Sequence, residues 1–531
     1  MKFCTRVAWS LIWLAGGVAW GQPVTLRGPG LESGQYEVTT FADGLNFPVG
    51  MTSLDDGSVL AAVSNGSSFF GSSSGSIVRL VDADRDGVAE LRETLVADVP
   101  GGRLSSLKRA GDLVAVTGQG QNVPISFYRI SDSPSELLSP LGQLQFTYPS
   151  GGWLHPHSSL LLRESPQTDG DYELYFQLGS DANFQATRRT VGLGGTLGLT
   201  ATLVGEAIHR VTLQDIGSGL VATSHDVVAT GLRNPTGLAF HPLTGDLYVG
   251  DNGIDGLVDP NEPTSPDEIN VLPATDLGGT PESYGFPSTY QEYRSGVDVG
   301  SSGLAPLTNF QPLPSPDGAE AEGINEIAFS PPLFGGSLAG GIFAGFHGIY
   351  SGGGLSNEEN AVAFVDPETG AYFHVIGNDE PAIGHLDGLH STRDTLFLAD
   401  ISPGGNLSPT NANSGKIYAI RSLIRPGDYN RDGLIDAADY TVWRDTQGES
   451  GLGLAADGDG DFAVGLGDYD VWRDAYNAAL VAGANRAPAP GAVTLLLIGA
   501  VFAIGLCARV RSKNSSDTRF REFTPPLGGS A

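Results

Sequence analysis

Residues 231–253 read GLRNPTGLAFHPLTGDLYVGDNG, and this stretch decides the fold. Two short alternating apolar runs, at 236–240 and 246–250, flank a turn that contains Pro242 and Gly245. Two such runs joined by a turn predict a β-hairpin. The same order of Gly-Leu, Pro, Gly, strand, turn and strand recurs at 41–60, and a weaker copy lies at 323–332. A repeat of strand, turn and strand predicts the blades of a β-propeller.

The surrounding sequence extends this pattern from residue 36 to residue 424. Runs such as SIVRLV, DLVAVTG, ELYFQLG, TLFLAD and KIYAI read as strands, and the chain has 75 glycines and 33 prolines to supply turns. At typical blade lengths this stretch holds about six four-stranded blades. We therefore expect an all-β, six-bladed propeller over 36–424, with a pair of β-sandwiches as the structural alternative.

The charge of the chain bounds its partners. It carries 29 basic and 60 acidic residues, a formal charge of −31. Nucleic-acid binding needs clustered Lys and Arg, so we exclude that class. The two cysteines, Cys4 and Cys507, lie in apolar segments near the two ends, so the predicted body contains neither a disulfide nor a thiol nucleophile.

The N-terminus is typical of an exported protein. Lys2 and Arg6 precede an apolar run at 7–18, and small residues follow it. This order predicts a signal peptide over 1–21.

The C-terminus carries a second apolar segment. A Pro/Ala linker at 481–490 precedes the uncharged run 491–508, and a basic tail follows over 509–531. Such a run is nearly long enough to span a bilayer, and its basic flank should stay cytoplasmic. Linker, apolar helix and basic cluster together resemble a PEP-CTERM-type sorting signal, with a plain membrane anchor as the competing interpretation. We expect the body at the cell surface or in the periplasm.

Between these parts lie two acidic loops with the spacing of calcium ligands. The first places Asp428, Asn430, Asp432, Gly433, Asp436 and Asp439 at positions 1, 3, 5, 6, 9 and 12 of a calcium loop. The second places Asp457, Asp459, Asp461 and Asp468 at positions 1, 3, 5 and 12. Alternate side chains of a tight loop converge on one cation, and Gly433 permits the sharp turn; Phe462 stands at the matching position of the second loop.

Each loop is followed by the same short motif, Tyr440-Thr-Val-Trp443 or Tyr469-Asp-Val-Trp472. The repeated ligand spacing and the repeated trailing motif resemble a type I dockerin. This resemblance implies a small α-helical calcium-binding domain over 425–480 and a cohesin-like protein partner. A single similar loop, Asp82, Asp84, Asp86, Gly87, Glu90 and Glu93, lies in the predicted propeller, where an ordinary acidic turn is the alternative to calcium.

Catalytic motifs are few in the body, but all nine histidines lie between His155 and His390. Four blocks carry a family resemblance: 231–253, 267–270, 284–287, and His157-Ser-Ser-Leu followed by 173–181. Together they resemble the glucose/sorbosone dehydrogenase family, six-bladed propellers that bind pyrroloquinoline quinone (PQQ) and calcium.

Carried over by position, the resemblance implies His157 as general base, and Arg233 and Asn234 against the quinone. It also implies that Gly253 and Ile254 offer backbone oxygens to calcium. No position matches the cofactor-binding Lys and Arg of the family's later blades. His347, or the group His385, Asp387 and His390, is an alternative lining of the pocket.

The alternative for these residues is a structural role, with Arg233 and Asn234 in a blade turn and His157 in the core.

Three function classes follow. The first, which we favour, is a PQQ- and calcium-dependent dehydrogenase acting on a sugar or alcohol. The second is a non-catalytic surface propeller that binds glycans or proteins and is attached through the dockerin-like module. The third is a calcium-dependent lactonase or hydrolase.

Overall fold

The computed structural model describes residues 22–31, 34–131, 136–258, 262–313, 323–348, 362–377, 380–381 and 383–486. The predicted signal peptide 1–21, membrane segment 491–508 and tail 509–531 lie outside these residues. Among the described residues, no helix is both long and apolar enough to cross a membrane.

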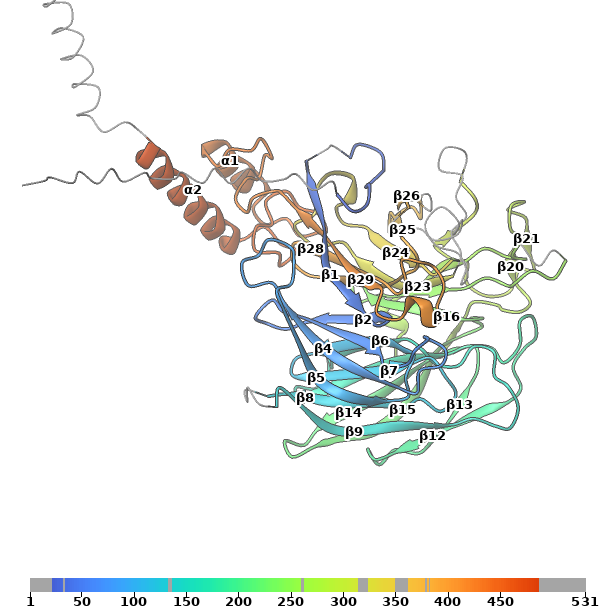
Figure 1. Ribbon diagram of the computed structural model, residues 1–531. Coiled ribbons are helices and arrows are strands. Elements are labelled where there is room, and N and C mark those ends of the chain that lie inside the picture. Colours follow the sequence, from blue (N-terminus) through green and yellow to red (C-terminus); the bar gives the residue numbers. More distant parts are fainter. Residues whose placement is uncertain are drawn as a thin grey trace, which may run out of the picture.

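Six sheets of four or more strands, antiparallel except for one short parallel pairing at a sheet edge, form the body, which confirms the predicted six-bladed propeller (Figure 1). The first blade contains β2 (Pro48–Ser53), β3 (Val59–Ser64), β4 (Ser74–Val81) and β5 (Leu91–Pro100). The second contains β6 (Leu104–Ala110), β7 (Leu113–Gly118), β8 (Ile125–Ile130) and β9 (Leu138–Thr147), extended by β12 (Thr190–Gly195) and β13 (Ala201–Val204). The third contains β10 (Leu160–Glu164), β11 (Asp171–Leu178), β14 (Ala207–Asp215) and β15 (Leu220–Thr230), with β19 (Glu282–Ser283) paired in parallel with β15 at its edge.

The remaining blades follow the same up-and-down order. The fourth contains β16 (Pro235–Phe240), β17 (Leu247–Asp251), β18 (Glu268–Leu272) and β22 (Thr308–Asn309). The fifth contains β23 (Ile324–Phe329), β24 (Ile342–Phe346), β25 (Val362–Val365) and β26 (Tyr372–Ile376). The sixth contains β27 (Leu386–Ser391), β28 (Thr395–Asp400), β29 (Gly415–Ser422) and β1 (Tyr36–Leu45). In the described connections lie a small hairpin of β20 (Tyr290–Gln291) and β21 (Asp298–Val299) and the 3-10 turns η1 (Ala274–Asp276), η2 (Gly336–Leu338) and η4 (Pro409–Asn411).

The sixth blade closes the ring with both ends of the propeller sequence. The N-terminal strand β1 pairs with the last strand, β29, from Tyr36 opposite Ser422 to Leu45 opposite Gly415. The inner strands then contact one another in a closed circle, in the order β2, β6, β10, β16, β23 and β27. Apolar side chains of neighbouring blades fill the space between the sheets; one cluster, for example, combines Phe127 and Phe146 of the second blade with Leu174 and Phe176 of the third.

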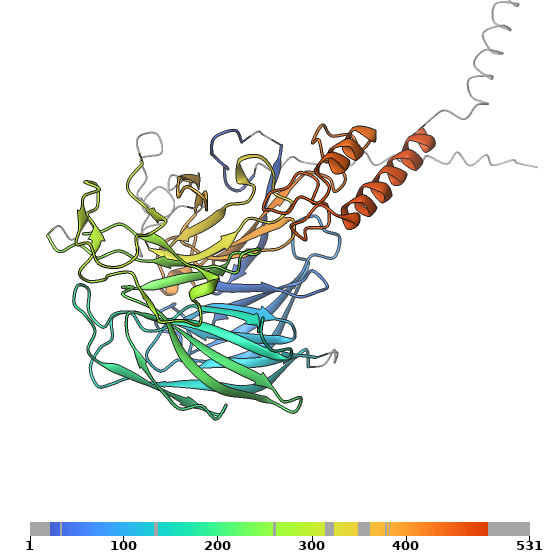
Figure 2. The same cartoon turned by 180° about the vertical axis from the view of Figure 1, so that it is seen from behind.

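Within the described residues, two α-helices follow the propeller, α1 (Ala437–Thr446) and α2 (Leu466–Arg486). Each begins in the last positions of one acidic loop, so that Asp439 lies in the first turn of α1 and Asp468 in that of α2, and α2 runs into the segment 481–490 expected as a linker. Trp443 and Trp472 pack with Tyr429, Tyr440 and Tyr469 in a small core between loops and helices. Both views place α1 and α2 together at one edge of the propeller (Figures 1 and 2).

Candidate functional site

A central cavity of about 340 Å³ opens where the inner strands begin. Every blade contributes a residue to its wall from the start of its inner strand: five of these are the second residue of the strand, and Ser158 lies two residues before β10. These residues are Val49, Ser105, Ser158, Thr236, Asn325 and Asp387. Because the closed ring of strands converges on this point, side chains that are far apart in the sequence meet here.

The block that decides the fold also forms one wall of the cavity. Arg233 and Asn234 both line it. Their backbone N–H groups donate to the carboxylate of Asp251 over 2.8 and 2.7 Å. Asp251 is the last residue of β17, so this pair of bonds fixes the start of the inner strand against its neighbour. Burial, together with the nearby Glu268, raises the pKa of Asp251 well above its usual range.

The Arg233 side chain is engaged within the protein. Its guanidinium donates to both oxygens of Asn183, at 2.7 and 3.1 Å, and to the Asn252 carbonyl at 3.3 Å. It also forms an ion pair of 2.8 Å with Asp255, and only 3% of the side chain is exposed. Arg233 therefore lies at the predicted place, but its charge is already balanced by a carboxylate.

The two predicted backbone ligands of calcium differ in position. Gly253 lines the cavity, and its N–H donates to Asp267 over 2.9 Å. Ile254 is 1% exposed, and its carbonyl oxygen accepts the N–H groups of Thr264 and Ser265. The Ile254 oxygen is thus used in the local turn and does not belong to the cavity wall.

His157, predicted as the general base, is a core residue in the structure. Its ring is fully buried and stacks on Phe146 with 3.6 Å between ring centres. Nδ1 bonds the Tyr148 hydroxyl and Nε2 bonds the Val123 carbonyl, each over 2.8 Å. The residue does not line the cavity, and burial lowers its pKa to about 3. Because both ring nitrogens are satisfied by protein, His157 has no lone pair to offer a substrate.

His155 takes the position that the sequence interpretation gave to His157. It lines the cavity, and its buried Nε2 has no hydrogen-bond partner among the described residues. Burial and the positive charge of Arg233 lower its pKa to about 3, so the imidazole is neutral at physiological pH. Its backbone pairs with Gly179 and Ser180 beyond β11, which turns the ring toward the centre.

A second histidine faces the same cavity. His347 Nδ1 lies 2.6 Å from Asp387 Oδ1, and both residues are buried in the wall. His347 also stacks on His385, whose nitrogens bond the carbonyls of His347 and Gly405. His347 and Asp387 therefore line the cavity, whereas His385 and His390, grouped with Asp387 in the sequence, are not among its lining residues.

No protein-family profile matches the chain. An uncharacterized protein of Borreliella burgdorferi is 44% identical over 71 residues, which are 13% of this chain and 17% of that protein. The matched part thus spans less than a fifth of the relative's length.

Among solved structures, the PQQ-bound aldose sugar dehydrogenase of Streptomyces coelicolor is 18% identical with a TM-score of 0.46, covering 73% of this chain and 98% of that one. The calcium structure of a Trichoderma reesei carbohydrate-active enzyme of family AA12 is 15% identical, with a TM-score of 0.47 and coverages of 76% and 98%. The PQQ domain of Coprinopsis cinerea pyranose dehydrogenase is 13% identical, with a TM-score of 0.44 and coverages of 75% and 98%.

The described cavity does not fit PQQ, a tricarboxylate. Arg233 is the one arginine or lysine among the described lining residues, and Asp255 already neutralises it. Lys108 on the inner strand β6 is paired with Glu326 over 2.7 Å. The internal segments outside the described residues contain no lysine or arginine in their sequence, so they add no cation. Planar carboxylates are held by bidentate arginine or by lysine, and the wall instead contributes Asp255, Asp267 and Asp387.

The acidic loops of the module have donor sets that fit calcium, a cation that prefers carboxylate and carbonyl oxygens. In the second loop, carboxylate oxygens of Asp457, Asp459 and Asp468 lie within 4.8 Å of one another. Burial raises the pKa of Asp457 to about 6, and the nearby Asp468 adds to the rise. Asp461 accepts the N–H of Ala463.

The first loop has the same local form. Asp428 accepts the N–H groups of Asp432 and Gly433, Asn430 accepts that of Asp432, and Asp439 accepts that of Asn430. Asp436 caps helix α1 by accepting from Ala438. Calcium binding in both loops, and the dockerin assignment itself, stay predictions.

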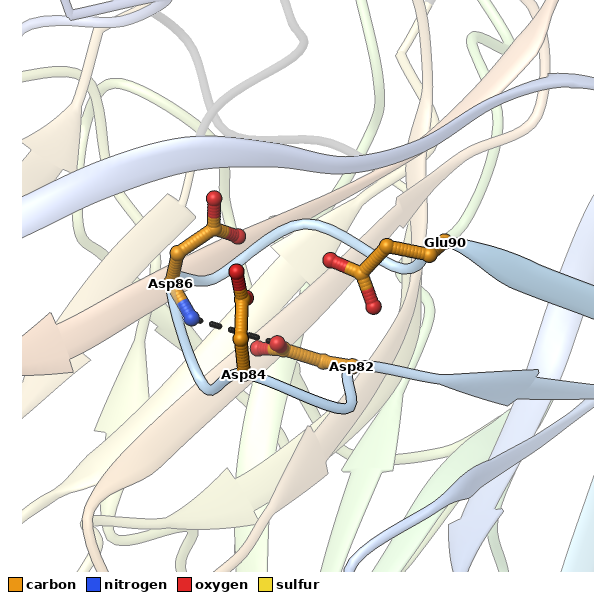
Figure 3. Close-up of side chains that lie close together, drawn as sticks. All are labelled: Asp82, Asp84, Asp86 and Glu90. Carbon is orange, nitrogen blue, oxygen red and sulfur yellow. Dashed lines mark hydrogen bonds between the residues drawn. The ribbon is translucent and has the colours of Figure 1, made fainter.

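The single acidic loop within the propeller that has calcium-ligand spacing joins β4 to β5. Figure 3 shows Asp82, Asp84, Asp86 and Glu90 gathered around it, and their oxygens lie within 4.8 Å of one another. Glu93, the last residue of the predicted ligand pattern, instead pairs with Arg79 over 3.7 Å. The loop is fastened to β1, because Gly87 accepts a hydrogen bond from Thr39 and Ala89 donates to Phe41.

Proposed function

We propose that the propeller acts on a hydroxyl group of a sugar or related polyol in the central cavity, with His155 as the proton acceptor. The observation that carries the proposal is the buried, unbonded Nε2 of His155 at the cavity wall. A neutral imidazole carries a lone pair that can accept a hydrogen bond from a hydroxyl group, although the lowered pKa of His155 makes it a weak base in the free protein.

The size and chemistry of the cavity support a hydroxylated ligand. Its volume of about 340 Å³ lies in the range of small-molecule sites. Neutral hydrogen-bonding side chains from several blades face it, namely Ser105, Gln119, Ser158, Asn234 and Asn325. Hydroxyl groups can both donate to and accept from such side chains, and a neutral ligand needs no counter-charge.

The resemblance of the 231–253 block to sugar dehydrogenases supports oxidation as the reaction class. Such an oxidation needs an electron acceptor, and PQQ is the acceptor that the resemblance implies. Because the described residues do not fit a tricarboxylate, the acceptor in this proposal is a diffusible electron carrier: the hydroxyl gives its proton to His155 and the carbon gives a hydride to that carrier. Calcium in the cavity is likewise not part of the proposal, since Ile254 offers it no oxygen.

A hydrolytic reaction on a lactone or ester is the second candidate, favoured by the His347–Asp387 pair. Asp387 accepts from Nδ1 and thereby orients the ring so that Nε2 carries the lone pair. A histidine paired with a carboxylate through Nδ1 is the arrangement used by general bases in hydrolases. A propeller that binds glycans without turnover is the third possibility.

We also propose that the protein is exported, that residues 491–508 attach it to a membrane, and that residues 425–480 bind a cohesin-like partner. The first two depend on segments outside the described residues.

The test uses the full chain and three variants: His155→Gln, His347→Gln and, as a matched control outside the cavity, His241→Gln. Calorimetry with a panel of sugars and polyols should show binding that His155→Gln weakens at least tenfold and His241→Gln leaves unchanged. Turnover is then followed with an artificial electron acceptor, with and without PQQ and calcium, and separately with a lactone panel.

Equal sugar affinity in His155→Gln and the parent, or no binding at all, would refute the assignment of His155. A spectral change of PQQ at micromolar concentration would show that the cavity does hold the quinone. Lactone hydrolysis lost in His347→Gln would establish the hydrolytic candidate instead.

A further inference from the structure

The calcium-loop module is packed directly against the propeller. Leu333 and Phe334, in the connection between β23 and β24, share a narrow crevice with Asp428, Tyr429 and Asp457 of the module. Residues near the first position of both acidic loops therefore face the fifth blade, and the module is not a separate body joined only by its chain connection.

An arginine of the propeller reaches into the second loop. Arg393, in the turn between β27 and β28, donates a hydrogen bond to the carbonyl of Gly458. Its aliphatic stem lies on Gly460, where a Cβ atom would stand 3.1 Å from the arginine Cγ. The sixth blade thus supplies a contact to the loop that is predicted to bind calcium.

Apolar contacts complete the interface beside the loops. Leu452 packs against Gly340 and the cluster formed by Phe329 and Ile342. Gly453 approaches so closely that a Cβ atom would stand 2.8 Å from the Ala339 methyl group. A contact of this closeness fixes the position of the segment that enters the second loop.

We propose that calcium bound in the second loop locks the module onto the fifth and sixth blades. Asp428 and Asp457 are 5% and 3% exposed, and the apolar side chains of Leu333 and Phe334 lie across the crevice. Buried carboxylates without a cation repel one another and lose hydration, and a bound cation removes both costs. Calcium therefore favours the docked arrangement, and by linkage the docked arrangement strengthens calcium binding.

This linkage concerns the propeller's own residues and is independent of the reaction in the cavity. It is tested on the full chain by hydrogen exchange with calcium and with a chelator. Amides of 331–341 and 391–395 belong to the propeller and not to either acidic loop. They should exchange faster when calcium is removed, because the module then leaves them.

Variants give a second readout, the calcium affinity of the full chain. Arg393→Gln should weaken binding at the second loop about fivefold, the lower end of typical couplings between linked sites. The direction of the change in calcium affinity distinguishes two roles of Arg393. If Arg393 acted only as a nearby positive charge, its removal would tighten calcium binding. Leu333→Asp places a charge in the apolar part of the interface and should also weaken calcium binding.

Arg473→Gln is the matched control, since Arg473 lies on α2 and pairs with Asp470 and Asp474 of the same helix. It should leave affinity and exchange unchanged. Unchanged exchange of 331–341 on calcium removal, tighter binding in Arg393→Gln, or no calcium binding by the full chain would each overturn the proposal.

Discussion

The contrast between His155 and His157 gives the sharpest prediction, because the two residues are neighbours with opposite surroundings. His157→Leu keeps most of the side-chain volume and removes two hydrogen bonds, to Tyr148 and Val123. An orphaned buried partner costs about 1–3 kcal/mol, so together we expect a loss of about 3 kcal/mol in the free energy of unfolding. At about 2.1 cal/mol/K of unfolding entropy per residue, a propeller of about 390 residues should lose about 4 °C in Tm.

His155→Leu should behave in the reverse way. Its Nε2 has no partner among the described residues, so its loss should change Tm by about 1 °C or less. Sugar binding should disappear in this variant and persist in His157→Leu. Thermal unfolding by circular dichroism and calorimetry with sugars measure both quantities. A His157→Leu protein of unchanged Tm that no longer binds sugar would refute the reasoning and return the site to His157.

Three further predictions follow from the same structure. Phe462 adopts φ +66° at the turn position that Gly433 holds in the first loop. Phe462→Gly should therefore stabilise the second loop by about 0.5–1 kcal/mol and tighten its calcium binding. Calorimetry measures this binding, with Phe373→Leu as the control. Asp457→Asn should abolish calcium binding at the second loop while Asp445→Asn does not, and a chelator titration separates the two. Burial raises the pKa of Asp400 to about 7, so the free energy of unfolding should fall as pH rises from about 4 through 7; Asp400→Asn should flatten that slope in denaturant titrations, and an equal slope in both proteins would contradict the assignment.

The fold could be predicted from the sequence because each blade repeats a local pattern. In 231–253 the alternation of apolar residues sets the inner hairpin, and Asp251 at its end accepts the N–H groups of Arg233 and Asn234. Asp400 plays the same part in the sixth blade by accepting from Gly384 and His385. These contacts join residues of one blade that are less than twenty positions apart, so the local sequence pattern is enough to predict them.

The cavity could be predicted only in part, because its wall depends on contacts between distant segments. His155 and His157 both precede β10 in an irregular stretch, where no strand alternation tells which ring faces inward. The pairing of His155 with Gly179 and Ser180 and the stacking of His157 on Phe146 decide it. Two histidines two residues apart were the available signal, and the histidine chosen from the sequence is the one in the core.

The charge of the cavity could not be predicted from the arginine alone. The sequence places Arg233 at the wall, and an unpaired guanidinium there would favour an anionic cofactor. Asp255, beyond the Asp251–Gly253 segment, folds back to pair with it. The same wall keeps His155 neutral, since adding a proton would bring a second positive charge beside Arg233 into a poorly hydrated site. A wall whose arginine is balanced and whose histidine resists protonation favours a neutral ligand, and this is why a hydroxylated sugar suits the cavity better than a trianionic quinone.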